Sequence, residues 1–301
     1  MKQTASSIAH FWQKHPCGAQ FVNADDWTDF FKKYDRFKDA TEPHIAGEIA
    51  QINLSEQRVL EIGLGQGCEA EKLVRSGAIY NGIDLTPESV ARVSRRFDLF
   101  SLPYESLQVM NAEKLNFPDS SFDVVFSHGV IHHSPRIDQI VSEIYRVLKP
   151  GGQLVLMLYH RNSANYQVSI RWLRRAGIFG LLVPGVAELI SKATGEPKDR
   201  LMFHVKNLKS NGLAYLKMEN FIHASTDGPE NVYSKVFSVD EARRLTAAFE
   251  AHHFSVHFLN KRHFPLVSSL IPQKMQNSLA SKWGWHLWLK CRKPTKLKHK
   301  N

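Results

Sequence analysis

Three histidines lie within six residues of the chain, at His128, His132 and His133. An imidazole titrates near neutral pH, so a histidine can take the proton from a phenol or another hydroxyl group. Such a cluster can also hold a metal ion, but no carboxylate at ligand spacing and no Cys-x-x-Cys pair accompanies these three. We therefore expect proton transfer here and predict no metal site. A purely structural role is the alternative.

A glycine-rich segment at 59–68 (VLEIGLGQGC) has the composition of a ligand cradle. An apolar run is followed by three glycines at alternate positions, Gly63, Gly65 and Gly67. Glycine adopts positive φ angles without strain and lacks the Cβ atom that would block a ligand. Residues 69–75 predict a helix whose free N–H groups would point back at the same turn. An ordinary glycine-rich turn between a strand and a helix is the alternative.

An acidic residue follows the cradle at the distance expected for a nucleotide site. Residues 78–85 (AIYNGIDL) predict a second buried strand, and Asp84 near its end lies about 20 positions after Gly63. A carboxylate there can accept hydrogen bonds from both hydroxyl groups of a ribose. Thr86 and Pro87 then predict the N-cap and first residue of a helix. Alternatively, Asp84 interacts only with the dipole of that helix.

The spacing of the glycines separates two kinds of nucleotide-binding domain. In the dinucleotide pattern G-x-G-x-x-G the third glycine would fall at position 68, which is a cysteine. Here it comes one residue earlier, and Glu61 stands two residues before the first glycine. The pattern E-x-G-x-G-x-G resembles motif I of the class I S-adenosylmethionine (SAM)-dependent methyltransferases. The order of the elements resembles the type 11 group of that family over residues 57 to about 160, with a weaker match at 237–293.

The resemblance implies SAM as the cofactor and indicates which residues contact it. These are Glu61, Gly63, Leu64, Gly65, Gly67, Asp84, Leu85, Asn111, Ala112, Glu113 and His128. Asn111 departs from the family, which usually has an aspartate here to receive the adenine amino group. An amide oxygen can still accept that hydrogen bond, although without a charge.

The resemblance also implies transfer of a methyl group to a small-molecule or lipid-like acceptor, at oxygen or carbon. The cofactor brings the reactivity, so alignment of donor and acceptor should matter more than any one side chain. We expect His132 or His133 to act as a base and Tyr159, after the fifth strand, to contact the acceptor. Similar histidine runs in the family often have structural roles, so that alternative stays open. Further candidates for the site are Tyr34, Glu42, His160, His223, Asp227 and Tyr233.

The predicted fold is α/β, a Rossmann-like sheet of seven mostly parallel strands with helices on both faces. Further strands are expected at 107–113, 122–127, 153–159, 254–259 and 285–291, and an amphipathic helix at 136–148. We expect an N-terminal helical lid (1–56), a SAM-binding core (57–160), a substrate-binding cap (161–236), the rest of the sheet (237–293) and a basic tail (294–301).

Composition limits the class of protein. The chain has 301 residues, of which 43% are hydrophobic and 23% charged, as in ordinary globular proteins. No apolar run approaches the roughly 18–20 residues of a membrane span, and the N-terminus lacks the apolar region of a secretory signal. Three scattered cysteines do not make a disulfide framework, so we expect a cytoplasmic protein.

The formal charge of +10 permits anionic partners. No RNA-binding signature accompanies it, so we favour a solvated basic surface over an RNA methyltransferase. A non-catalytic SAM-binding protein with a regulatory or assembly role is the other alternative. Tryptophans and lysines in 264–300 indicate either a peripheral membrane contact or, as the favoured reading, core packing and a dimer contact. The sequence does not define the oligomeric state.

Overall fold

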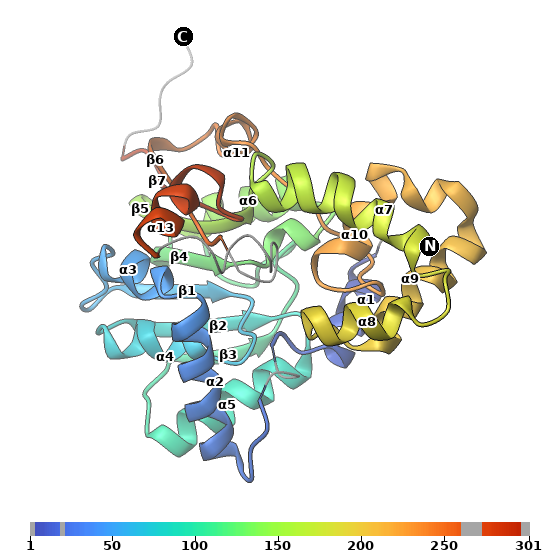
Figure 1. Cartoon of the computed structure of the whole chain (residues 1–301). Coiled ribbons are helices and arrows are strands. Elements are labelled where there is room, and N and C mark those ends of the chain that lie inside the picture. Colours follow the sequence, from blue (N-terminus) through green and yellow to red (C-terminus); the bar gives the residue numbers. More distant parts are fainter. Residues whose placement is uncertain (1–3, 19–21, 260–272, 296–301) are drawn as a thin grey trace.

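A single mixed sheet lies at the centre of the molecule. The structure, a computed structural model, describes residues 4–18, 22–259 and 273–295. Within these residues the strand order is β3-β2-β1-β4-β5-β7-β6 (Figure 1). The strands are β1 (Arg58–Ile62), β2 (Ile79–Asp84), β3 (Ser106–Val109), β4 (Phe122–His128), β5 (Leu148–Tyr159), β6 (Glu250–His257) and β7 (His286–Arg292). Strands β1 to β5 pair in parallel and β7 is antiparallel to both neighbours, which confirms the predicted sheet.

Helices cover both faces of the sheet, because successive side chains of a strand point to opposite sides. Leu60 of β1 belongs to the same core cluster as Ile140 of α6, whereas Val59 belongs to the cluster that contains Leu73 of α4. The helices next to the sheet in sequence are α4 (Cys68–Arg75), α5 (Pro87–Phe100), α6 (Ile137–Val147), α11 (Val239–Leu245) and α13 (Gln273–Trp283).

Three helices precede the sheet, as the sequence predicted for the N-terminal segment. They are α1 (Ala5–Lys14), α2 (Trp27–Thr41) and α3 (His44–Ala50). Arg96 of α5 is only 1% exposed and connects α2 to the core through ion pairs. Its guanidinium group forms an ion pair with Asp35 of α2 and another, at 2.8 Å, with Glu71 of α4. The N-terminal segment is therefore held against the motif I helix.

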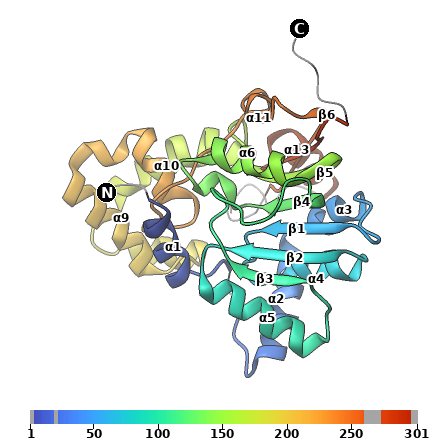
Figure 2. The same ribbon diagram turned by 180° about the vertical axis from the view of Figure 1, so that it is seen from behind.

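The segment between β5 and α11 is mainly helical. It contains the π-helical η3 (Asn165–Arg174), α7 (Arg175–Gly180), α8 (Val186–Thr194), α9 (Lys198–Asn211), the 3-10 segment η4 (Gly212–Leu216) and α10 (Met218–Thr226). Figures 1 and 2 show these helices beyond the carboxyl ends of β1 and β2. Ile170 and Phe221 pack with Trp285 in a separate core cluster. In the described ranges, no helix has the length and apolar character needed to cross a membrane.

Local sequence signals set several element boundaries. The Thr86 side chain accepts a hydrogen bond from the backbone of Ser89, with Pro87 at the first position of α5, as predicted. Strand β3 ends at Val109, four residues earlier than expected. The amide oxygen of Asn111 accepts the N–H of Glu113 (2.9 Å), and this local turn competes with continued strand pairing.

A buried ion pair joins α3 to the other end of the chain. The Glu48 carboxylate lies 2.7 Å from Lys290 Nζ of β7 and 2.7 Å from His257 Nε2 of β6. The Ser255 hydroxyl also donates to it (2.5 Å). Burial alone would raise the pKa of Glu48, but the hydrogen bonds outweigh burial and lower the pKa to about 2.

We expect Glu48→Gln to lower the free energy of unfolding by about 3 kcal/mol at neutral pH, because Lys290 would stay buried without a counter-charge. The folded-state pKa is depressed, so the ionised Glu48 stabilises the native state above the ordinary value of 4.5 and loses this effect as pH falls toward 2. The difference from the wild type should therefore shrink with acidification. Denaturant titration at several pH values measures it, with the exposed Glu219→Gln as control. A difference independent of pH would contradict the ion-pair assignment.

Candidate active site

A cavity of about 360 Å³ lies where the carboxyl ends of β1, β2, β4 and β5 meet. The strand order reverses between β1 and β4, and open α/β sheets bind ligands at such a switch point. Helices α1 and α2 form another wall, and Asp227, after α10, and Trp285, before β7, contribute from the far side. The volume lies in the range of small-molecule pockets.

The glycine-rich turn has two distinct functions in the geometry of this cavity. Gly63 has φ +87°, and a Cβ atom there would lie 2.2 Å from Val130 after β4. Gly65 has φ +52°, and a Cβ atom on it would have no heavy atom within 4 Å, so its backbone borders open space in the cavity. Gly67 does not line the cavity. It faces Val93 and Arg96 of α5, which pack so closely that a Cβ atom on Gly67 would lie 3.0 Å from each side chain.

Asp84 is held in one orientation at the end of β2. Its Oδ2 accepts the N–H of Leu64 (2.8 Å), and its Oδ1 accepts both the N–H (2.9 Å) and the hydroxyl (2.8 Å) of Thr86. A carboxylate has about four acceptor sites. These three hydrogen bonds occupy three of them, so one site remains for a ligand. Asp84, Leu64 and Leu85 all line the cavity, as expected for predicted cofactor contacts.

Glu61 and the loop after β3 complete this end of the cavity. Glu61 is 1% exposed and accepts a hydrogen bond from the Tyr80 hydroxyl. Burial raises the pKa of Glu61 well above its ordinary value, so its carboxyl group favours the neutral form. Asn111, Ala112 and Glu113 also line the cavity, as predicted. Glu113 accepts the Ser134 hydroxyl (2.8 Å) and lies 3.4 Å from Arg136, so its carboxylate is already engaged by the protein.

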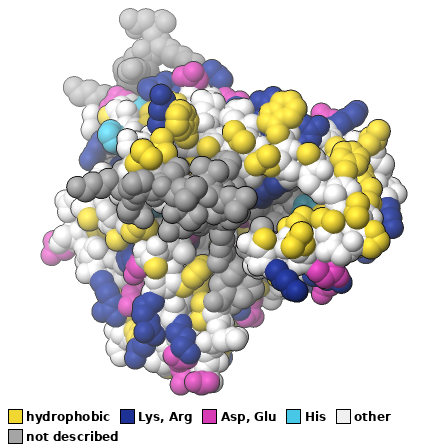
Figure 3. Space-filling view, in the orientation of Figure 1, with side chains coloured by type: hydrophobic (Ala, Val, Ile, Leu, Met, Phe, Trp, Pro, Cys, Tyr) yellow, Lys and Arg dark blue, Asp and Glu magenta, His cyan; other side chains and the backbone are white. Residues whose placement is uncertain are grey.

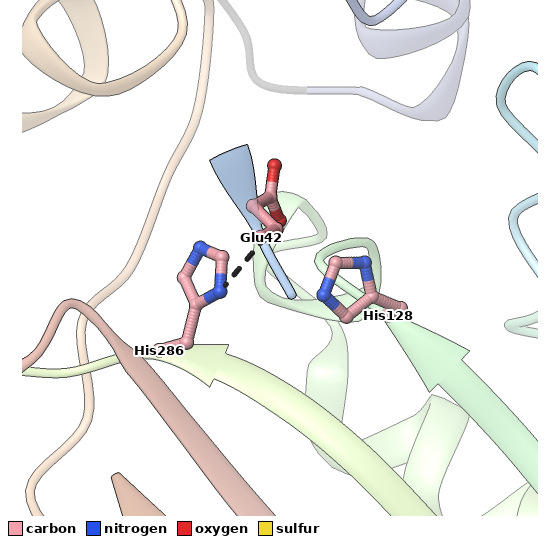
Figure 4. A group of neighbouring side chains, drawn as sticks. All are labelled: Glu42, His128 and His286. Carbon is pink, nitrogen blue, oxygen red and sulfur yellow. Dashed lines mark ion pairs between the residues drawn. The ribbon is translucent and has the colours of Figure 1, made fainter. Parts of the chain in front are cut away.

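A charged cluster lies between α2 and the sheet. Lys38 Nζ of α2 is 3.1 Å from Glu42 Oε1 and 3.6 Å from Glu69 Oε1 of α4. His128 Nδ1 is 3.6 Å from the same Glu69 oxygen, and His286 Nδ1 is 3.8 Å from Glu42 Oε2. Figure 4 shows Glu42, His128 and His286 converging from α2, β4 and β7. Lys38 of α2 thus joins the N-terminal helices to Glu69 of α4.

Burial and the neighbouring charges set the protonation of this cluster. Burial opposes the charge on Lys38, yet Glu42 and Glu69 outweigh it and raise its pKa well above the ordinary value. Burial likewise opposes ionisation of Glu69, but Lys38 and then His128 lower the Glu69 pKa to about 2. Burial, followed by the charge of Lys38, lowers the His128 pKa to about 3. At neutral pH the cluster holds a lysine cation, an ionised Glu69 and a neutral His128.

Glu42, His128 and His286 are also donor types that bind divalent metals, and their ligand atoms lie within 4.8 Å of one another. No other such group occurs in the described ranges. However, Glu42 already has the Lys38 ammonium group as its counter-ion, and that group would repel a metal cation placed beside it. We assign no metal to this group, and the absence of a metal stays a prediction.

A second polar group lies at the other end of the cavity. The Tyr159 hydroxyl donates to Asp227 Oδ1 (2.6 Å). His133 Nδ1 lies 2.9 Å from the carbonyl oxygen of Tyr233, which only accepts, so Nδ1 carries the proton and Nε2 the lone pair. His133 Nε2 is 3.6 Å from Asp227 Oδ2, longer than a hydrogen bond. Trp12 of the lid packs edge-on against His133, with ring centroids 5.0 Å apart.

The two adjacent histidines have different positions. His133 lines the cavity, whereas His132 is fully buried behind Tyr159, with ring centroids 4.0 Å apart, and does not line it. Burial lowers the pKa of His132 well below its ordinary value and raises that of Tyr159 well above its own. Of the three predicted catalytic residues, the structure therefore brings His133 and Tyr159 to the cavity.

Several lining residues were missed by the sequence reasoning. They include Lys38, Gln66, Glu69, Trp285 and His286. Glu69 directly follows the glycine-rich turn, and its place in the first turn of α4 was the one local signal available. Of the further candidates, Tyr34, Glu42 and Asp227 line the cavity. His160, His223 and Tyr233 do not line it.

The charged groups that line the cavity discriminate between a dinucleotide and a positively charged nucleoside. The described lining residues include one lysine or arginine, Lys38, and six carboxyl groups. These are Glu42, Glu61, Glu69, Asp84, Glu113 and Asp227, of which Glu61 favours the neutral form. An ionised Glu69 at the start of α4 would repel the pyrophosphate that a dinucleotide places at this helix end. An acidic cavity instead favours a cationic ligand such as a sulfonium compound.

Comparison with known proteins agrees with this geometry. Residues 60–156 match the family model described as "Methyltransferase domain". The chain is similar to this family over that segment. This confirms the predicted resemblance and, with it, SAM as the cofactor of the family. The methyltransferase domain accounts for about a third of the chain.

The methyltransferase domain is similar to curated enzymes over part of their length. A phthiotriol/phenolphthiotriol dimycocerosates methyltransferase of Mycobacterium leprae is 38% identical over 35% of this chain and 38% of its own. A fatty-acid O-methyltransferase of Mycolicibacterium smegmatis is 37% identical over 34% of this chain and 37% of its own. A ubiquinone biosynthesis O-methyltransferase of Xanthomonas oryzae pv. oryzae is 34% identical over 40% of this chain and 51% of its own. The chain thus matches about half or less of each relative.

Solved structures share the fold over nearly the whole chain. The [4+2]-cyclase SpnF is 16% identical, with a TM-score of 0.54 over 97% of this chain and 98% of that one. A SAM-dependent methyltransferase of Methanosarcina mazei is 19% identical, with a TM-score of 0.50 over 83% and 98%. Because one of these neighbours is named a cyclase, the fold alone does not define the reaction.

Proposed function

We propose that this protein transfers the methyl group of SAM to a hydroxyl group of a small, lipid-like acceptor. One observation carries the proposal: the glycine-rich turn with Asp84, and the His133–Asp227–Tyr159 group, open into the same cavity. The first group fits a nucleoside and the second can handle a proton. Their juxtaposition is what an O-methyltransferase needs.

The cofactor would occupy the acidic end of the cavity. Asp84 would accept a hydrogen bond from the ribose, and Asn111 and Leu85 would border the adenine. Lys38 and Glu69 offer opposite charges for the carboxylate and amino group of the methionine part. When bound, SAM supplies an electrophilic methyl group on a positively charged sulfur. Gly65 would leave room for it beside the backbone.

At the other end, His133 Nε2 would take the proton of the acceptor hydroxyl. Asp227 lies 3.6 Å from this atom, so its negative charge would stabilise the imidazolium that forms. Tyr159 holds Asp227 through its hydroxyl group and is a positioning residue. Trp12 covers His133 from the lid and excludes water. His132, buried behind Tyr159, supports this arrangement by packing.

Apolar side chains line part of the cavity and favour a lipid-like compound. They are Ile8, Trp12, Val130, Phe258 and Trp285. The names of two relatives refer to fatty-acid and ubiquinone O-methylation, and one refers to dimycocerosates. We further propose that the helical segment 161–236, which contributes Asp227, acts as the substrate cap. These features support an acceptor with an apolar body and one reactive hydroxyl.

Adding SAM should raise the melting temperature of the purified protein by about 5 °C at a concentration of about 100 Kd, since SAM binds only the folded state. NAD at the same concentration should leave it unchanged, because the acidic cavity disfavours a pyrophosphate. Differential scanning fluorimetry makes the comparison. Equal shifts for both compounds would contradict the cofactor assignment.

Methyl-labelled SAM then tests the acceptor class. Incubation of the protein with labelled SAM and a cell extract should place the label in the organic-solvent phase. Mild alkali should release the label as methanol if the product is an ester, and should leave it in place if the product is an ether. Bound SAM with label confined to RNA would move an RNA methyltransferase ahead of our proposal.

A further inference from the structure

The helices between β5 and α11 expose an unusual number of large apolar side chains. Nine of the fifteen exposed large hydrophobic residues among those described lie between positions 168 and 213. Six of them form what we call the outer face: Val168, Trp172, Leu173, Phe179, Leu182 and Val183. Figure 3 shows hydrophobic side chains gathered over these helices, on the right of the molecule. The exposed apolar side chains are therefore concentrated in this segment and are not scattered evenly over the surface.

The helices that carry the outer face are apolar on both sides. On the inner side, Ile170 and Ile178 are 0% and 3% exposed and pack in a core cluster of the same helical segment. On the outer side, Trp172 is 65% exposed and Phe179 is 50% exposed. A surface helix of a globular protein normally has one apolar side and one polar side. The second apolar side needs a partner that the described part of the chain does not provide.

The charge around the outer face indicates the kind of partner. The sequence has no aspartate or glutamate from position 144 to position 187. Arg171 and Arg175 lie in the same two helices, η3 and α7, and no ion pair joins either of them to a described residue. Their hydrogen bonds go to Gln167 and to the backbone of Arg171. Tryptophan, aliphatic side chains and unpaired arginines together match the interface of a bilayer that contains anionic lipids.

The outer face is coupled to the cavity through the inner side of the same helices. The core cluster of Ile170 and Ile178 includes Trp285, and Tyr159 packs against it. Tyr159 and Trp285 both line the cavity. A membrane bound at the outer face would therefore lie across one packed layer of side chains from the acceptor end of the site.

We propose that the outer face inserts into the interfacial region of an anionic lipid bilayer and presents the cavity to acceptors carried in that bilayer. The docking itself stands independently, and only the link to acceptors rests on the proposed function. The occupant is the lipid surface, because a protein partner would need acidic groups opposite Arg171 and Arg175 to make the same fit. For segment 264–300, the sequence favoured core packing and a dimer contact over a membrane contact, and Trp285 and Trp288 are indeed buried. Residues 264–272 and 296–300 lie outside the described residues.

Vesicle flotation tests the docking without any cofactor or acceptor. The full chain should float with vesicles of equal parts phosphatidylcholine and phosphatidylglycerol and much less with phosphatidylcholine alone. The combined change Trp172→Ser, Leu173→Ser and Phe179→Ser should reduce the partition coefficient on the order of 100-fold. Changing Arg171→Gln should reduce it about fivefold, and only for the anionic vesicles.

The matched control is Leu99→Ser on α5, which removes another exposed leucine (47%) away from the outer face and should leave flotation unchanged. Calorimetric titration with SAM shows separately that each variant is folded and that the cofactor assignment holds. Equal flotation of the triple variant and the wild type would overturn the proposal. A second result would also overturn the proposal: the wild type does not float and is a dimer in sedimentation velocity, and the triple variant is a monomer. In that case a second copy of the chain would cover the outer face.

Discussion

His133→Ala should lower kcat by about 10²–10⁴-fold while the Kd for SAM changes less than about threefold. Nε2 of His133 is the lone-pair nitrogen at the acceptor end, because Nδ1 is committed to the Tyr233 carbonyl. Without the imidazole, the hydroxyl proton would have no acceptor of comparable strength. Single-turnover kinetics with the labelled acceptor, paired with SAM calorimetry, separates these two quantities.

Three further variants sharpen this test. Asp227→Asn keeps an oxygen for the Tyr159 hydroxyl but removes the negative charge 3.6 Å from His133, so kcat should fall while the fold persists. Tyr159→Phe should have a smaller effect, about tenfold, because it removes only one hydrogen bond to Asp227. His253→Ala on the exposed part of β6 is the matched histidine control. A His133→Ala enzyme with normal kcat would show that positioning alone drives the reaction.

Asp84→Ala should weaken SAM binding about 30-fold, because a hydrogen bond from the ribose to a charged group would be lost. Asp84 also accepts hydrogen bonds from Leu64 and Thr86, so this variant disturbs the turn as well as the ligand contact. Calorimetry gives the affinity, and thermal denaturation without ligand gives the structural cost. An unchanged Kd would remove Asp84 from the site.

Gly65→Ala separates the two effects. The added methyl group enters open space in the cavity, so it should lower SAM affinity at least tenfold with only the stability cost of a positive φ angle. Gly195→Ala is the matched control, since Gly195 also has a positive φ (+73°) and no heavy atom within 4 Å of a Cβ position, but does not line the cavity. The two variants should lose similar stability, and only Gly65→Ala should lose affinity.

Local patterns explain why much of the fold was predictable. The glycines from Gly63 to Gly67 and the Thr86–Pro87 pair placed β1, α4 and α5 close to their observed bounds. A capping box formed by Ser238 and Glu241 begins α11. The strand β5 starts at Leu148, earlier than predicted, because Leu148 pairs with Phe122 before a register shift in the ladder. Such cross-strand pairing is not encoded in the local pattern.

The site was predictable only where it is local. The cofactor turn lies within one strand–helix unit, and all but one of its predicted contacts line the cavity. In contrast, Glu42, His128 and His286 come together from the lid, the sheet centre and the last strand, and no sequence spacing relates them. Likewise, His132 and His133 are neighbours with the same chemistry. Only the 3-10 turn η2 (Ile131–His133) decides which of them reaches the cavity.

The pairing of β5 with β7 affects how the molecule can be divided for experiments. The segment that matches the methyltransferase family ends at residue 156, yet β5 is hydrogen-bonded to β7 from Gln153 to Tyr159. A fragment cut after the family match would expose this apolar strand as an open edge, which is a template for aggregation. Glu48 would also lose Lys290, its partner from β7. Expression trials should therefore keep both ends of the polypeptide together, because the first helices and the last strand belong to one cooperative folding unit.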